Sequence, residues 1–224
     1  REKMEENYSN TLKIRDNVIK YRKWKVKDKK KFKLAQKAND AIMSHNALVY
    51  DCIENKNVIL TPEEQKFMLM ALRSVSIGDT LEYTFNCDAC EEDYDYTGKI
   101  SELFIPEFTE YGTLKSNSVE FRMGKIQSKE YYDRAMGETE EDEDKFLVDF
   151  LFHIKSLNDN DTMEFNELFE YVNNMEVDMA EDIFVQWKKM RFEYSEVKSV
   201  TCPHCGAVEN YEFDTLPGFL PESW

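Results

Sequence analysis

Apolar residues recur at helical spacing in several stretches of the chain, and shorter stretches in which they alternate lie between them. The sharpest helix start is Thr61 followed by Pro62, an N-cap and a proline in the first turn. The apolar positions that follow at helical spacing are Phe67, Met68, Met70, Ala71, Leu72 and Val75. The pattern predicts a buried helix that begins at Pro62 and ends before Gly78.

Weaker helical patterns precede this helix. Residues 2–21 carry a thin apolar stripe and predict a helix that needs a partner. Asp28 is expected to act as the N-cap of a second helix, and residues 40–55 predict a third with a broader apolar face. The chain is therefore expected to begin with an N-terminal helical arm.

Three further helices are predicted in the second half of the chain. One covers residues 145–157, and another is capped by Asp161 or Thr162 and continues to Val172. The last covers residues 177–197 and leads into a strand.

Two cysteine pairs interrupt stretches that alternate as strands. Cys87 and Cys90 lie between LEYTFN and YDYTGKI, which predicts a hairpin with the cysteines in its turn. Cys202 and Cys205 follow the strand-like segment KSVT. Each pair offers two thiols in a tight turn, which is half of the shell that a tetrahedral metal requires. We therefore expect the two pairs to meet, although more than a hundred residues separate them.

Four thiolates would close the shell of a zinc ion and leave no position for water, which makes such a site structural. The prediction is one structural zinc per chain, held by Cys87, Cys90, Cys202 and Cys205. An iron–sulfur cluster uses the same four ligands, and spacing alone does not separate the two. Two disulfides and free buried thiols are the other readings. The fifth cysteine, Cys52, is expected to be a small core residue.

The two knuckles differ in the residue after the second cysteine. The second knuckle has Pro203 in its turn and Gly206 after it, where a positive φ is often required. The first has Glu91 in place of the glycine, with Asp88, Glu92 and Asp93 close by.

Composition fits a protein with one good core. The chain has 224 residues, of which 42% are hydrophobic. We expect an α+β fold with a helix-rich body and a small β zinc-ribbon-like unit built from the two CxxC knuckles. The expected division is a basic N-terminal helical arm or docking region at residues 1–58 and a core domain at residues 59–224, closed by the split four-cysteine site.

The net charge of −16 conceals an asymmetry. Residues 1–40 hold 14 Lys and Arg against 6 Asp and Glu, whereas the rest holds 15 against 39. A basic arm on an acidic body suggests docking onto an acidic surface, either on a neighbouring copy or on another subunit. A solvated helix face is the alternative. The acidic body argues against a nucleic-acid-binding zinc ribbon, because phosphate contacts require concentrated Lys and Arg.

The signatures of common enzymes are missing from the sequence. It contains no GxSxG, no phosphate-binding glycine loop and no HExxH, and His45, His153 and His204 lie far apart. No apolar run approaches the roughly 20 residues that span a bilayer. The prediction is a non-enzymatic protein without a membrane-spanning segment.

The order of these motifs resembles one family of phage proteins. The segment TPEEQKFMLMALRSVSIGDTLEYTFNCDAC, a long helical middle and CPHCGAVENYEFDTLPGFLPES together look like the small baseplate hub family of T-even-like contractile-tailed phages. The segment KYRKWKVKDKKKFKLA is similar to that family's amino-terminal segment, so the resemblance covers most of residues 20–224. Glu91 departs from the family's pattern.

The resemblance implies a structural component of the virion at the tail baseplate, made in the host cytoplasm and joined to other hub subunits or to copies of itself. The four cysteines correspond to the paired cysteines of the family's pattern. A transient assembly factor that is absent from the finished particle is the main alternative. A nucleic-acid-binding zinc-ribbon module is the less favoured one.

Overall fold

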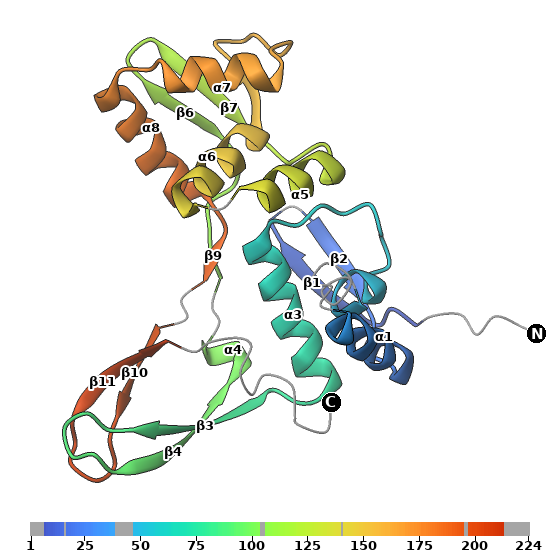
Figure 1. Ribbon diagram of the computed structural model, residues 1–224, viewed down its shortest axis with the longest axis vertical. Helices are drawn as coiled ribbons and strands as arrows, with labels where there is room; N and C mark the ends of the chain where they lie inside the picture. Colours follow the sequence, from blue (N-terminus) through green and yellow to red (C-terminus); the bar gives the residue numbers. More distant parts are fainter. Residues whose placement is uncertain are drawn as a thin grey trace, which may run out of the picture. The chain divides into compact units, whose positions relative to one another are not determined.

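The computed structural model describes residues 7–15, 17–38, 47–103, 106–139, 141–194 and 197–212. The chain has a mixed α+β fold with small antiparallel sheets, as predicted (Figure 1). It divides into two compact units. Unit 1 comprises Arg1–Glu107 and Phe192–Trp224, and unit 2 comprises Phe108–Arg191. The functional division expected at residue 58 stays a prediction.

Unit 1 begins with a hairpin where a helix was expected. Strands β1 (Asn10–Ile14) and β2 (Asn17–Tyr21) pair in antiparallel register, and Arg15 turns the chain with a φ of 53°. The prediction of a helix over residues 2–21 is therefore wrong for the part that the structure describes. Ile14, Ile19 and Tyr21 are buried because they share the inner face of the hairpin, and β-branched residues favour the extended backbone.

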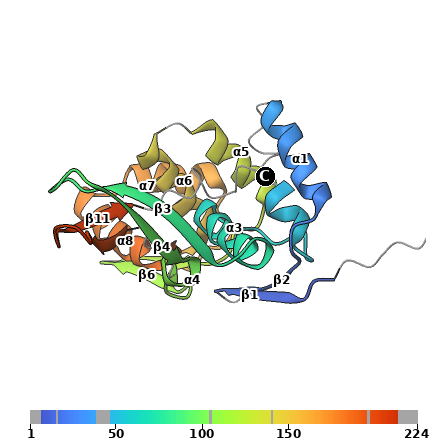
Figure 2. The ribbon, with the colours of Figure 1, turned by 90° about the horizontal axis from the view of Figure 1, so that it is seen from below.

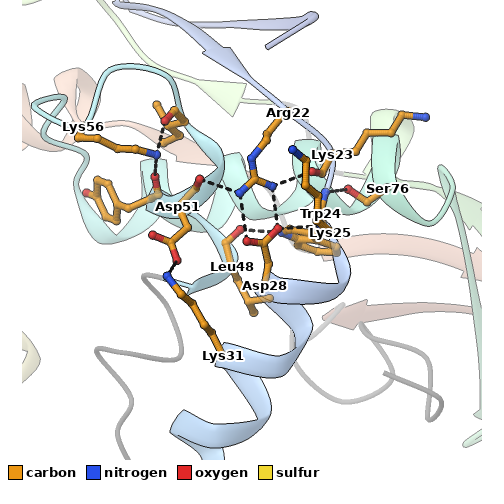
Figure 3. A network of polar contacts seen from close by, with 12 residues as sticks. Arg22, Lys23, Trp24, Lys25, Asp28, Lys31, Leu48, Asp51, Lys56 and Ser76 are labelled. Atoms are coloured by element: carbon orange, nitrogen blue, oxygen red, sulfur yellow. Dashed lines mark hydrogen bonds and ion pairs between the residues drawn. The ribbon is translucent and has the colours of Figure 1, made fainter. Parts of the chain in front are cut away.

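Helix α1 (Val26–Lys37) follows, and a buried ion pair fixes its first turn (Figure 3). Arg22 Nη1 and Nη2 lie 2.7 and 3.0 Å from the two carboxylate oxygens of Asp28. The backbone N–H of Lys25 donates to the same carboxylate at 2.7 Å. Asp28 thus caps α1 from its third position, with Lys25 as the N-cap, which corrects the prediction that Asp28 is the N-cap itself.

The helix predicted over residues 40–55 is only partly testable, because residues 40–46, including His45, lie outside the described residues. In the described part, Tyr50–Cys52 form a single 3₁₀ turn, η1. Trp24 anchors this segment, since its indole Nε1 donates to the carbonyl of Leu48 at 2.7 Å (Figure 3).

Helix α3 (Pro62–Ser76) confirms the helix that the sequence predicts most sharply. Thr61 Oγ1 accepts from the N–H of Glu64 at 3.3 Å, and the Glu64 carboxylate accepts from the N–H of Thr61 at 3.0 Å. This capping box satisfies two backbone donors that the helix start would otherwise leave unpaired. Arg15 Nε lies 3.4 Å from Glu64 and so ties the turn of the first hairpin to α3.

The rest of unit 1 is built from short strands. Strands β3 (Thr80–Asn86) and β4 (Asp93–Lys99) form one long two-stranded ribbon, which we call the ribbon (Figure 2). A short helix α4 (Ile100–Leu103) follows, and β5 (Pro106–Glu107) pairs with β9 (Glu193–Tyr194). Strands β10 (Val197–Thr201) and β11 (Val208–Glu212) form the last hairpin.

Unit 2 contains a three-stranded antiparallel sheet in the order β6 (Thr113–Ser116), β7 (Val119–Met123) and β8 (Ile154–Leu157). The alternate residues of β7 are buried, so one face of the sheet forms the core. Four helices complete the unit: α5 (Lys129–Glu138), α6 (Asp142–His153), α7 (Phe165–Asn173) and α8 (Val177–Met190). Its core cluster consists of Leu114, Val119, Phe121, Met123, Phe150, Leu151, Leu157, Leu168, Val172, Ile183, Trp187 and Met190.

Three predicted boundaries in unit 2 and at its end need correction. The helix expected to reach residue 157 ends at His153, because the next four residues pair with β7 as β8. The N-cap of α7 is Glu164 rather than Asp161 or Thr162. Helix α8 ends at Met190, short of residue 197.

Candidate metal centre

The first knuckle joins β3 to β4. Its turn is closed by the N–H of Cys87, which donates to the carbonyl of Glu92 at 3.1 Å, and by the N–H of Glu91, which donates to the carbonyl of Cys87 at 2.8 Å. Glu91 has a φ of 60°, in the left-handed region that glycine adopts most easily. A residue that carries a side chain is strained in this conformation.

The second knuckle joins β10 to β11 and has the same backbone. The N–H of Cys202 donates to the carbonyl of Ala207 at 2.8 Å, and the N–H of Gly206 donates to the carbonyl of Cys202 at 3.0 Å. Gly206 has a φ of 78°, as its position after the second cysteine predicts. Gly206 and Glu91 therefore occupy equivalent places in the two knuckles.

The two knuckles bring four sulfur atoms together, and we call Cys87, Cys90, Cys202 and Cys205 the four-cysteine cluster. All four Sγ atoms lie within 4.8 Å of one another. The distance is 3.6 Å between the sulfurs of Cys87 and Cys205, and 3.8 Å between those of Cys90 and Cys202. Four sulfurs bound tetrahedrally to zinc at about 2.3 Å would be separated by about 3.8 Å.

The spacing of the sulfurs therefore fits a tetrahedral metal ion of the size of zinc. All five cysteines of the chain are free thiols, so the cluster contains no disulfide. Cys87 and Cys202 are buried, Cys90 is half-buried and Cys205 is exposed. Four protein sulfurs leave no open position on such an ion, so it would serve structure rather than catalysis.

The electrostatics of the cluster differ from one thiol to the next. Burial raises the pKa of the Cys87 thiol to about 12, and its hydrogen bond to the carboxylate of Glu209 adds to this. Burial would also raise the pKa of Cys202, but the backbone N–H groups of Cys205 and His204 outweigh it and lower that pKa to about 7. Metal binding would release the protons of these thiols, so a low pH would weaken metal binding.

A second set of contacts that the sequence did not reveal joins the two hairpins. Glu209 Oε1, on β11, lies 3.2 Å from Cys87 Sγ and accepts from the N–H of Asp88 at 3.0 Å. Its other carboxylate oxygen accepts from the hydroxyl of Tyr211. The Tyr211 hydroxyl also lies 3.3 Å from that of Tyr94, on β4. A residue of β11 therefore holds the backbone of the opposite knuckle in place.

An aromatic contact supports the same junction. The rings of Phe85 and Tyr211 stack with their centroids 3.9 Å apart and an interplanar angle of 17°. Phe85 also contacts Tyr94 and Tyr96 on its own ribbon. The alternation of aromatic residues along β3 and β4 is the sequence signal that could have indicated this contact.

The remaining candidate ligands lie elsewhere. Cys52 is fully buried in unit 1, where burial raises its pKa to about 12 and keeps it a neutral thiol. His153 is buried in unit 2 next to the carbonyl of Asp149, at 2.7 Å. His204 belongs to the second knuckle but is exposed. Among the described residues, the four-cysteine cluster is the only group of three or more potential metal ligands that lie together.

Comparison with known protein families gives one clear result. The chain matches the family described as T4 bacteriophage base plate protein over residues 5–221. No curated protein and no solved structure matched the chain. In the described part of the chain, no helix has both the length and the apolar character that crossing a membrane would require.

Proposed function

The chain belongs to the T4 bacteriophage base plate protein family, and on that premise we propose that it is a non-enzymatic structural subunit of the baseplate hub. It would be made in the host cytoplasm and retained in the virion tail. The observation that carries the proposal is the family match over nearly the whole chain, because it includes both cysteine hairpins and the helical middle.

In this role the four-cysteine cluster would bind one structural zinc ion. The ligands would be Cys87, Cys90, Cys202 and Cys205, whose sulfur separations support tetrahedral coordination. The ion would join the ribbon to the β10–β11 hairpin, two segments far apart in the sequence. Iron with sulfide remains the alternative occupant, since it uses the same ligands.

Residues 1–58 would dock the protein onto other hub subunits, and residues 59–224 would form the core that the metal closes. The concentration of Lys and Arg in residues 1–40 supports the docking role, since the rest of the chain is strongly acidic. The acidic body also makes nucleic acid an unfavourable partner.

Quantitative mass spectrometry of purified virions tests the proposal. A hub subunit is present in a fixed ratio to other tail proteins, and the ratio survives further purification of the particles. If the chain is abundant in infected cells but missing from purified virions, it is a transient assembly factor instead.

A further inference from the structure

Helix α1 presents an exposed face that combines positive charge with apolar side chains. Val26 and Leu34 are 71% and 64% exposed. Lys30, Lys33 and Lys37 are exposed as well. These five residues recur at spacings of three and four, so they form one stripe along the helix, which we call the basic face of α1.

The opposite face of α1 is held in place. Asp28 and Ala35 are fully buried, and Asp28 is paired with the buried side chain of Arg22 (Figure 3). A charged pair held by this many hydrogen bonds fixes the rotation of the helix about its axis. The basic face is therefore presented in a defined direction.

The ribbon has an acidic face of complementary character. The register pairs Thr84 with Asp95 and Asn86 with Asp93, so these residues share one side of the ribbon with Glu82. The aromatic residues of the ribbon occupy the other side, because successive side chains alternate. We call the acidic face of the ribbon the exposed carboxylates of this side together with those of the adjoining knuckle turn: Glu82, Asp93 and Asp95 on the strands, and Asp88, Glu91 and Glu92 in the turn.

No lysine or arginine interrupts the acidic face, because the sequence has none between Thr80 and Gly98. A zinc ion bound by four thiolates would add two further negative charges. The basic face of α1 and the acidic face of the ribbon are therefore complementary in charge.

We propose that the basic face of α1 binds the acidic face of the ribbon in a second copy of this chain. Since the two surfaces differ, the contact is head-to-tail and each copy can bind two neighbours. In this contact the lysines of α1 would pair with the carboxylates of the ribbon. The inference deepens the docking role proposed above by naming its partner, and it can fail while the metal site and the hub role stand.

Charge reversal tests the contact on the full-length, metal-loaded protein. One variant carries Lys30→Glu, Lys33→Glu and Lys37→Glu, and the other carries Glu82→Lys, Glu92→Lys and Asp95→Lys. Sedimentation at low salt should show self-association of the wild type, weakened about tenfold or more in each variant alone because attractive pairs become repulsive. Salt at about 0.5 M should weaken the wild-type association in the same way.

Mixing the two variants gives the sharpest result. In the mixture, the reversed α1 of one variant meets the reversed ribbon of the other, and the two native faces meet as well. Each contact joins opposite charges, so the mixture should associate as the wild type does. A matched control reverses three exposed lysines elsewhere, with Lys13→Glu, Lys188→Glu and Lys189→Glu, and should leave self-association unchanged. Metal content should stay the same in all of the variants.

Four results would overturn the proposal. The wild type stays monomeric at low salt, the mixture fails to associate, or the control variant weakens association as much as the others. The fourth is that the Lys→Glu variant loses binding to labelled double-stranded DNA that the wild type shows, which would assign the basic face to a polyanion. Virion mass spectrometry is independent of all four.

Discussion

Unit 2 and the two cysteine hairpins of unit 1 are stabilised in different ways. The sheet of unit 2 buries one face under helices, and its core is a continuous apolar cluster that includes Phe150 and Trp187. In the ribbon, by contrast, β3 buries only Leu81 and β4 buries Tyr94 and Gly98. Two-stranded hairpins are marginally stable at best in water. The difference indicates that the hairpins depend on a cross-link, whereas unit 2 does not.

The largest effect should come from removing one ligand of the cluster. Cys202→Ser should abolish metal binding and destabilise the two hairpins by more than about 5 kcal/mol, because structural zinc supplies about 10–16 kcal/mol in zinc-finger peptides. Hydrogen exchange should show β3, β4, β10 and β11 losing protection while β6, β7 and β8 keep theirs. Cys52→Ser is the matched control, and equal loss of protection in both variants would contradict the account.

Trp187→Ala should have the opposite effect: the strands of unit 2 should lose hydrogen-exchange protection, and the two cysteine hairpins should keep theirs. The side chain is 1% exposed and packs against Phe150 and His153 in unit 2. Its Nε1 has no hydrogen-bond partner among the described residues, so the substitution mainly removes apolar contacts. The free energy of unfolding, measured with urea, should fall by about 3–5 kcal/mol. Metal content should not change. Loss of the metal in this variant would show that the two regions are not independent.

A smaller effect is expected from Asp28→Asn, and it depends on pH. Burial opposes the charge of Asp28, but the hydrogen bonds from Arg22 and the backbone of Lys25 outweigh it and hold the pKa of Asp28 below its usual value. Its stabilisation is therefore present above about pH 4 and is lost as the pH falls through the folded-state pKa.

At neutral pH the variant should be less stable by about 2 kcal/mol, since asparagine keeps one acceptor but not the charge. The free energies of unfolding of the wild type and the variant can be measured with urea from pH 7 to pH 3. The difference between them should become smaller below pH 4. A difference that stays constant over this range would mean that Asp28 is not the titrating group.

The smallest effect is expected from substitutions at Glu91 and Gly206, the equivalent positions of the two knuckles. Glu91→Gly should raise the stability of the metal-loaded hairpins by about 0.5–1 kcal/mol, because a non-glycine residue with positive φ is strained. Gly206→Ala should lower it by a similar amount for the same reason. Thermal unfolding in high salt measures both, and a destabilising Glu91→Gly would show that the Glu91 side chain has a role of its own.

The elements that could be predicted are those whose signals are local. Thr61, Pro62 and Glu64 specify the start of α3 through contacts within one turn, and the two CxxC pairs identified the knuckles. The N-terminal hairpin is wrongly predicted as a helix, because the spacing of Leu12, Val18 and Ile19 does not separate a helical from a strand period.

Apart from the meeting of the two cysteine pairs, contacts between residues distant in sequence could not be predicted. The segment Ile154–Leu157 continues the apolar pattern of α6, and only its pairing with β7 makes it a strand. The roles of Glu209 and Tyr211 likewise depend on a hairpin more than a hundred residues away. Spacing predicted that the four cysteines come together, but not the contacts that orient them.

The most direct test of the account is the metal content of the protein, purified without added metal or a nickel column, together with a count of its reactive thiols. The account predicts about one zinc per chain and four thiols protected until a chelator is added. Freely reactive thiols at Cys90 and Cys205 in a protein without metal would contradict it.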